Sequence, residues 1–252
     1  MRTFKLTLAY DGTDFAGWQM QPGKRTVQAA LEASLAKITG EPIRAAASGR
    51  TDSGVHALGQ VVSFHSATAL SGTTLRNALN AELPRDMSAL CVEEAAERFH
   101  ARRDCVRKRY RYQVHDGEAP DVFQRRYAWQ YRQRLDASAM NRAAQAFVGT
   151  HDFRSFETHW PQRSSSVRTI YEMAVCRAAH DRRNLITMEV SGNGFLYNMV
   201  RAMVGTLVEV GRGTRPASWP AEVVAAGDRG AAGMTAPPHG LFLVRVDYKS
   251  DA

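Results

Sequence analysis

The sequence has few cysteines, no long apolar run and only five lysines among 33 basic residues. Three cysteines without a Cys-x-x-Cys spacing predict neither a disulfide framework nor a zinc site, and they favour a reducing cytoplasm. No run approaches the apolar length that spans a bilayer, and the first residues alternate like a strand instead of forming the apolar region of a signal peptide. These absences argue against a secreted disulfide scaffold and a membrane-spanning protein.

Positive charge is the first informative feature. A net charge of +8 and a pI near 9.7 favour an anionic partner. The excess is uneven, since residues 98–134 carry 11 basic and 4 acidic groups with tyrosines and a tryptophan between them. Cations contact phosphates and aromatic faces stack on bases, so this mixture predicts RNA sooner than a membrane surface. The candidate RNA-binding residues are Arg102, Arg103, Arg107, Lys108 and Arg109.

Strand and helix patterns alternate along the whole chain. Capping residues and apolar periodicity predict helices at residues 26–40, from Thr73 or Thr74 to Pro84, after Asp136, at 195–210 and after Ser218. Strands are expected near residues 4–10, 61–65, 110–114, 170–176, 185–190 and 241–248, and a mobile loop at 157–168.

This order predicts an α+β fold of two halves. The expected subdomains are residues 1–104 and 105–252, which share one sheet because no Gly/Ser linker separates them. The two halves have similar strand–helix order, although the sequence shows no obvious repeat.

Residues 49–56 form the strongest candidate site. Gly49 and Gly54 bracket Asp52, and Arg50 lies two positions before the carboxylate. Two glycines at this spacing indicate a tight backbone path. An arginine keeps a nearby carboxylate ionised, as a nucleophile or general base requires. The alternative is an ordinary turn with a surface ion pair.

The tripeptide at residues 52–54 also resembles the active-site signature of aspartic proteases. That chemistry needs two carboxylates that share a proton, and the chain has no second Asp-Ser/Thr-Gly. The strong positive charge and Arg50 favour an ionised Asp52 over a proton-sharing one. A protease is therefore disfavoured.

Tyr110 and Arg201 are two further candidate residues, and each has two interpretations. Tyr110 lies among cations that favour its phenolate, so it can act as acid or base; otherwise it packs in the core or stacks on a ligand. Arg201 lies on an apolar helix, where it must find a carboxylate or extend to solvent. The Gly192-x-Gly194 spacing is too incomplete to predict a nucleotide loop.

Taken together, these segments resemble the tRNA pseudouridine synthase A family (TruA type). The resemblance covers essentially the whole chain in order. It runs through residues 10–19, 49–57, 80–84, 99–102, Tyr110, 149–156, 195–201 and 208–211. Ser53 stands where the family usually has alanine, another small residue, so no change of activity is expected.

The resemblance implies a pseudouridine synthase α+β fold around a central cleft, and isomerisation of uridine to pseudouridine at positions 38, 39 and 40 of the tRNA anticodon stem-loop. It implies that Asp52 is the catalytic aspartate, Arg201 its partner, and Tyr110 the residue that stacks on the target base and serves as general base. Arg50 would fill the space vacated by the flipped nucleotide or hold it extruded, and Leu196 would line the uracil pocket. It further implies a homodimer that uses neither a metal nor a nucleotide cofactor.

A protein of another class remains as a rival. A non-catalytic RNA-binding module, such as a chaperone of tRNA folding, would present the same basic and aromatic surface. It gives no reason for the matched presence of Asp52 and Arg201.

Overall fold

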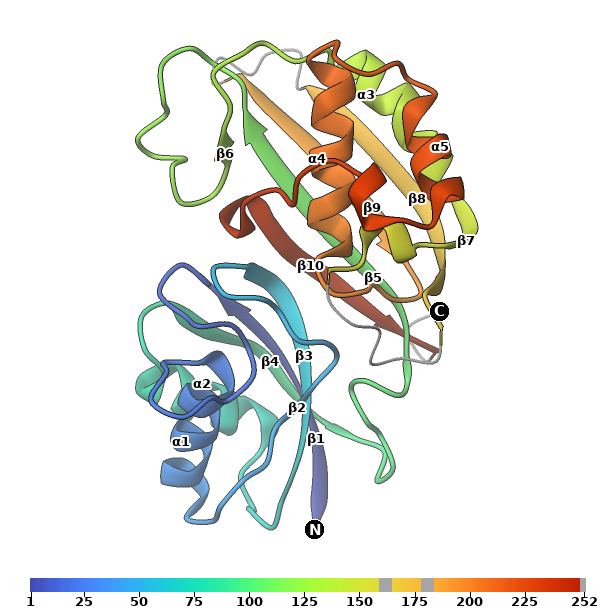
Figure 1. Cartoon of the computed structure of the whole chain (residues 1–252). Helices are drawn as coiled ribbons and strands as arrows, with labels where there is room; N and C mark the ends of the chain where they lie inside the picture. Colours follow the sequence, from blue (N-terminus) through green and yellow to red (C-terminus); the bar gives the residue numbers. More distant parts are fainter. Residues whose placement is uncertain (159–164, 178–183, 250–252) are drawn as a thin grey trace. The chain divides into compact units, whose positions relative to one another are not determined.

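The computed structural model describes residues 1–158, 165–177 and 184–249, and the chain divides into two compact units (Figure 1). The first unit comprises Met1–Val106 and Phe242–Ala252, and the second comprises Arg107–Leu241. The boundary thus lies two residues after the expected one, and the C-terminal strand belongs with the first unit instead of the second. Each unit combines a mixed, mostly antiparallel sheet with helices, which confirms the α+β class.

The sheet of the first unit is built around an alternating strand. Phe4, Leu6 and Leu8 lie on one inner strand, point to the same face of the sheet and are fully buried. The sheet has the order β4 (Met87–Ala95), β1 (Arg2–Tyr10), β3 (His56–Ser66) and β10 (Leu241–Tyr248), with β2 (Ala46–Ala47) on β3. All pairings are antiparallel except that of β10 with β3. Helices α1 (Val27–Thr39) and α2 (Gly72–Glu82) lie together on one face (Figure 1).

The two helices of this unit begin at capping side chains. The Thr26 hydroxyl accepts from the Ala29 N–H, and Gly40 ends α1 in the left-handed conformation, as predicted. Helix α2 begins earlier than predicted. Ser71 caps it by accepting from the Thr74 N–H at 3.1 Å, so Thr74 lies inside the first turn.

The second unit places three helices on one face of its sheet (Figure 1). The sheet has the order β5 (Cys105–His115), β9 (Leu185–Gly192), β8 (Val167–Arg177) and β7 (Gly149–Asp152), with the short β6 (Trp129–Gln130) parallel to β5. The helices are α3 (Ala137–Ala144), α4 (Met199–Gly211) and α5 (Trp219–Ala226). Single 3₁₀ turns lie at Gln145–Phe147, Arg154–Phe156, Arg229–Ala231 and Pro238–Gly240.

Two sequence predictions in this unit need adjustment. Helix α4 begins at Met199 and not at residue 195, because Asn198 has a φ of +60° and interrupts helical geometry before it. Of the loop predicted at 157–168, residues 159–164 lie outside the described residues, and Val167 already belongs to β8.

Among the helices that the structure describes, none has the length and apolar character to cross a membrane.

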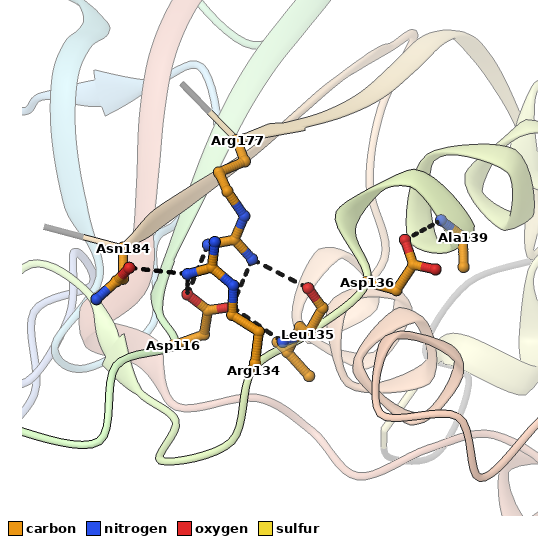
Figure 2. Close-up of polar contacts among 7 residues, drawn as sticks. All are labelled: Asp116, Arg134, Leu135, Asp136, Ala139, Arg177 and Asn184. Atoms are coloured by element: carbon orange, nitrogen blue, oxygen red, sulfur yellow. Dashed lines mark hydrogen bonds and ion pairs between the residues drawn. The ribbon is translucent and has the colours of Figure 1, made fainter. Parts of the chain in front are cut away.

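A cluster around one buried carboxylate fixes one end of this sheet (Figure 2). Asp116, directly after β5, has a fully buried carboxylate that accepts two hydrogen bonds from Arg177 at the end of β8. It also accepts from the Leu135 N–H at 2.9 Å, just before α3. Arg134 lies 3.5 Å from the same carboxylate and donates to Asn184 Oδ1, which precedes β9. The cluster thereby joins the ends of three strands to the start of a helix.

Charge balance in this cluster decides the ionisation of its carboxyl group. Burial acts to raise the pKa of Asp116, but the hydrogen bonds from Arg177 and Leu135 outweigh it and the pKa lies below its ordinary value. The group therefore stays ionised at neutral pH.

Candidate active site

Asp52 lies in a tight turn between β2 and β3 of the first unit. The Val55 N–H donates to the Asp52 carbonyl at 3.1 Å, and Gly54 has a φ of +78°. A type II turn needs a positive φ at its third position, which glycine adopts without strain. The tight backbone path predicted for this glycine is confirmed. The turn leaves the Asp52 side chain half-buried.

Buried polar side chains hold the first half of the turn. The hydroxyls of Tyr10 and Thr51 are hydrogen-bonded at 2.7 Å. The Gln60 amide donates to the Gly49 carbonyl at 2.9 Å and accepts from the Ser48 hydroxyl at 2.7 Å. Burial raises the pKa of Tyr10 to about 12, so its hydroxyl remains protonated and available to this network. The backbone on the N-terminal side of Asp52 is therefore fixed from inside the unit.

The loop after β1 contacts the turn on both sides of Asp52. Its Phe15 carbonyl accepts from the Gly54 N–H at 3.3 Å, and its Trp18 N–H donates to the Thr51 carbonyl at 3.0 Å. Gly17 has a φ of +89°, and a Cβ atom there would lie 2.8 Å from the Thr51 carbonyl oxygen. Only glycine permits this approach, so the two loops pack backbone against backbone.

His56 joins the same loop to the first residue of β3. Its Nδ1 accepts from the Gly12 N–H at 3.0 Å, and the Asp11 carboxylate lies 3.1 Å from that nitrogen. The imidazole is buried and stacks on Phe242 with 4.7 Å between ring centroids. A Cβ atom on Gly12 would lie 2.0 Å from the Val55 carbonyl oxygen. The sequence pattern predicts no role for His56, Tyr10 or Gln60, yet all three hold the Asp52 turn or the loop against it.

Tyr110 lies on β5 of the second unit and is buried. It is paired with Val190 of β9, and its ring packs against Phe195 in a T-shaped arrangement with 5.1 Å between centroids. Leu196 is also buried, and its N–H points at the Met199 sulfur at 3.5 Å. Tyr110 and the segment before α4 therefore share an aromatic contact.

Arg201 lies on the first turn of α4 and makes two hydrogen bonds in the second unit. Its Nε donates to the Ala236 carbonyl and one terminal nitrogen donates to Asn198 Oδ1, both at 2.7 Å. Burial raises the pKa of Tyr112, and the positive charge of Arg201 opposes that shift. The guanidinium is thus held close to a protonated tyrosine.

A segment of chain downstream of α5 runs along α4 and supplies the Ala236 carbonyl. The Ala236 N–H donates back to the Arg201 carbonyl at 3.1 Å, and the Gly233 N–H donates to the Thr206 hydroxyl at 3.0 Å. A Cβ atom on Gly205 would lie 1.7 Å from the Met234 carbonyl oxygen. We call residues 229–237 the α4 strap. Its position depends on the absence of a side chain at residue 205.

The predicted RNA-binding residues differ in their surroundings. Arg102 and Arg103 are exposed on a turn of the first unit. Arg107, on β5, lies over the ring of Tyr171 at 4.7 Å. Arg109 forms an ion pair with Glu172 at 2.6 Å, across the sheet from β5 to β8. Lys108 is half-buried on β5.

The candidate residues are distributed over both units. Asp52 and the exposed Arg50 belong to the first unit, and Tyr110, Leu196 and Arg201 belong to the second. Within residues 1–158, 165–177 and 184–249, no group of three or more histidine, cysteine or acidic side chains is placed to hold a metal ion.

Comparison with known proteins finds one family in both the family model and the individual relatives. A family model described as tRNA pseudouridine synthase matches residues 7–104 and 143–249. The tRNA pseudouridine synthase A of Limosilactobacillus fermentum is 46% identical over 100% of this chain and 98% of its own. That of a Geobacillus strain is 48% identical over 98% of each chain.

A solved structure titled "Crystal Structure of a Cbf5-Nop10-Gar1 Complex" covers 95% of this chain and 57% of its own, at 14% identity and a TM-score of 0.35. The family assignment does not depend on it. The match of the family model and the identity along the full chain show that this protein belongs to the tRNA pseudouridine synthase family.

Proposed function

We propose that this protein, an isomerase by its family, converts uridine to pseudouridine at positions 38, 39 and 40 of the tRNA anticodon stem-loop, with Asp52 as the nucleophile. The observation that carries the proposal is identity to tRNA pseudouridine synthases along the full chain. The rigid turn that presents Asp52 supports it, because a nucleophile must be held in a defined direction.

The reaction assigns a task to each proposed residue. The bond between C1′ and N1 breaks, the uracil rotates, and a bond forms between C1′ and C5. Asp52 stabilises or covalently traps C1′ while the base is detached. Uracil departs with the N1 electron pair, so after the new bond forms the proton on C5 leaves to the Tyr110 phenolate as general base, and N1 takes up a proton. Substrate and product are isomers, so no cofactor enters the balance.

The remaining residues act on charge and on the position of the base. Arg201 supplies the positive partner of the Asp52 carboxylate. Leu196 lines the uracil pocket, and Arg50 occupies the space that the flipped nucleotide vacates. Flipping costs roughly a few kcal/mol, which backbone contacts by the basic residues offset. We further propose that the protein is a cytoplasmic homodimer.

Mapping of pseudouridine in an unmodified tRNA transcript tests the function. After incubation with the purified protein, we expect pseudouridine at those positions among 38–40 that carry uridine, and no signal at a position changed to cytidine. An unmodified transcript after binding to the protein would instead favour the non-catalytic RNA-binding module.

Salt dependence tests the role of the exposed basic residues. We expect tRNA affinity to fall steeply with salt, because arginines that contact phosphates release counterions. Arg102→Ala together with Arg103→Ala should reduce the slope of log affinity against log salt by about two. Arg109→Ala is the matched control, because Arg109 is paired with Glu172 and its loss should change the slope less. A flat response in the unchanged protein would contradict the assignment.

A further inference from the structure

Asn198 combines an unfavourable backbone conformation with a side chain that does not cap its helix. Its φ is +60°, and Asn184 is the other non-glycine residue with positive φ in the described ranges. A glycine would adopt this φ more easily, so the backbone alone gives no reason for a side chain here. Asparagine is a favoured helix cap, yet this side chain makes no capping hydrogen bond to α4.

The Asn198 side chain contacts Arg201 instead. Its Oδ1 accepts from a terminal nitrogen of Arg201 at 2.7 Å, while the Ala236 carbonyl accepts from the Nε at the same distance. A guanidinium is planar, so two acceptors at separate nitrogens fix the plane as well as the position of the group. Asn198 makes this contact from a position three residues before Arg201, where its own φ is positive.

We propose that Asn198 is a positioning residue for Arg201. It does not contact the reacting atoms; with the α4 strap it holds the guanidinium plane in the orientation needed for the chemical step. This inference rests on the role that the proposed function gives to Arg201, and it adds the residue that orients that group. Catalysis depends strongly on such orientation, because a misdirected group loses most of its effect.

Asn198→Gly tests the proposal because glycine keeps the backbone conformation and removes only the amide. We expect the single-turnover rate on bound tRNA to fall roughly tenfold or more, as for loss of a hydrogen bond to a charged group. The dissociation constant for tRNA should stay within about twofold and the melting temperature should hardly change, since glycine relieves strain at this φ. This division between rate and binding separates positioning from a merely structural role.

Asn184→Gly is the matched control. Asn184 also has a positive φ, of 56°, and its Oδ1 accepts from an arginine, Arg134, at 2.8 Å in the Asp116 cluster. The same substitution there should leave the single-turnover rate unchanged. A rate for Asn198→Gly within twofold of the unchanged protein, or a loss that appears only in tRNA binding, would overturn the inference.

The outcome is distinguishable from failure of the proposed function. Asp52→Asn is measured in the same assay. If Asp52→Asn is inactive and Asn198→Gly is fully active, the inference fails and the function stands. If Asp52→Asn is active and Asn198→Gly is slow, the nucleophile assignment fails, while Asn198 still positions a group that the reaction needs.

Discussion

Asp52→Asn should abolish turnover while tRNA binding remains. An amide of nearly the same shape carries no negative charge and is a poor nucleophile, so the sugar is neither stabilised nor trapped. We expect the rate to fall by roughly four orders of magnitude or more, the scale seen when a nucleophile is removed. The measurement is release of tritium from tRNA that carries 5-tritiated uridine.

The control for this substitution is Ser53→Ala in the same turn. The Ser53 hydroxyl donates to the Phe15 carbonyl at 3.2 Å, and we expect its loss to leave the rate within about threefold, as for loss of one neutral hydrogen bond. Binding of both variants, measured by filter retention, should match that of the unchanged protein. Tritium release by Asp52→Asn at the normal rate would assign the chemistry to another group.

Arg177→Met should strongly destabilise the second unit. The substitution leaves the Asp116 carboxylate buried without its bidentate partner, and breaking such a buried pair costs about 3–5 kcal/mol. Urea unfolding at pH 7 measures the loss. Lys37→Met, which removes an exposed ion pair with Glu82, is the control and should cost less than about 1 kcal/mol.

The pH dependence of this difference has a defined sign. In the unchanged protein the pKa of Asp116 is lowered, so its contribution to stability is complete above the ordinary aspartate pKa of about 4 and is lost as the pH falls further. In Arg177→Met, the carboxylate keeps only the Leu135 N–H and the more distant Arg134, so burial raises that pKa relative to the unchanged protein and protonation relieves the variant as the pH falls. The stability difference should therefore shrink below about pH 5. A constant difference would contradict the assignment to Asp116.

Local signals in the sequence predicted the helix ends well. Thr26, Gly40 and Asp136 act through hydrogen bonds or backbone angles within a few residues of themselves, so one segment contains all the information needed. The start of α4 was predicted four residues too early, because Phe195 and Leu196 continue its apolar pattern. A residue pattern does not reveal the positive φ of Asn198 that stops the helix there.

The supports of the candidate site depend on contacts that a linear pattern does not contain. Tyr10 reaches Thr51 across 41 positions, and Gln60 reaches Gly49 across 11. Counting charges likewise placed Arg109 in a basic cluster, whereas folding brings Glu172 to it from 63 positions away. The sequence names the candidate residues, and the side chains and backbone groups that hold them are found only in the fold.

The α4 strap has a consequence for how this chain tolerates sequence change. Its close contacts to α4 are made by backbone atoms of Gly233, Met234 and Ala236. A Cβ atom on Gly233 would lie 2.7 Å from backbone atoms of α4, so this position admits no side chain, whereas the exposed Met234 can change without moving the carbonyl that holds Arg201. Insertions or deletions between α5 and residue 236 move that carbonyl directly. Natural variation in this segment should therefore keep Gly233 and the segment length constant, and alter residue identity at the exposed positions.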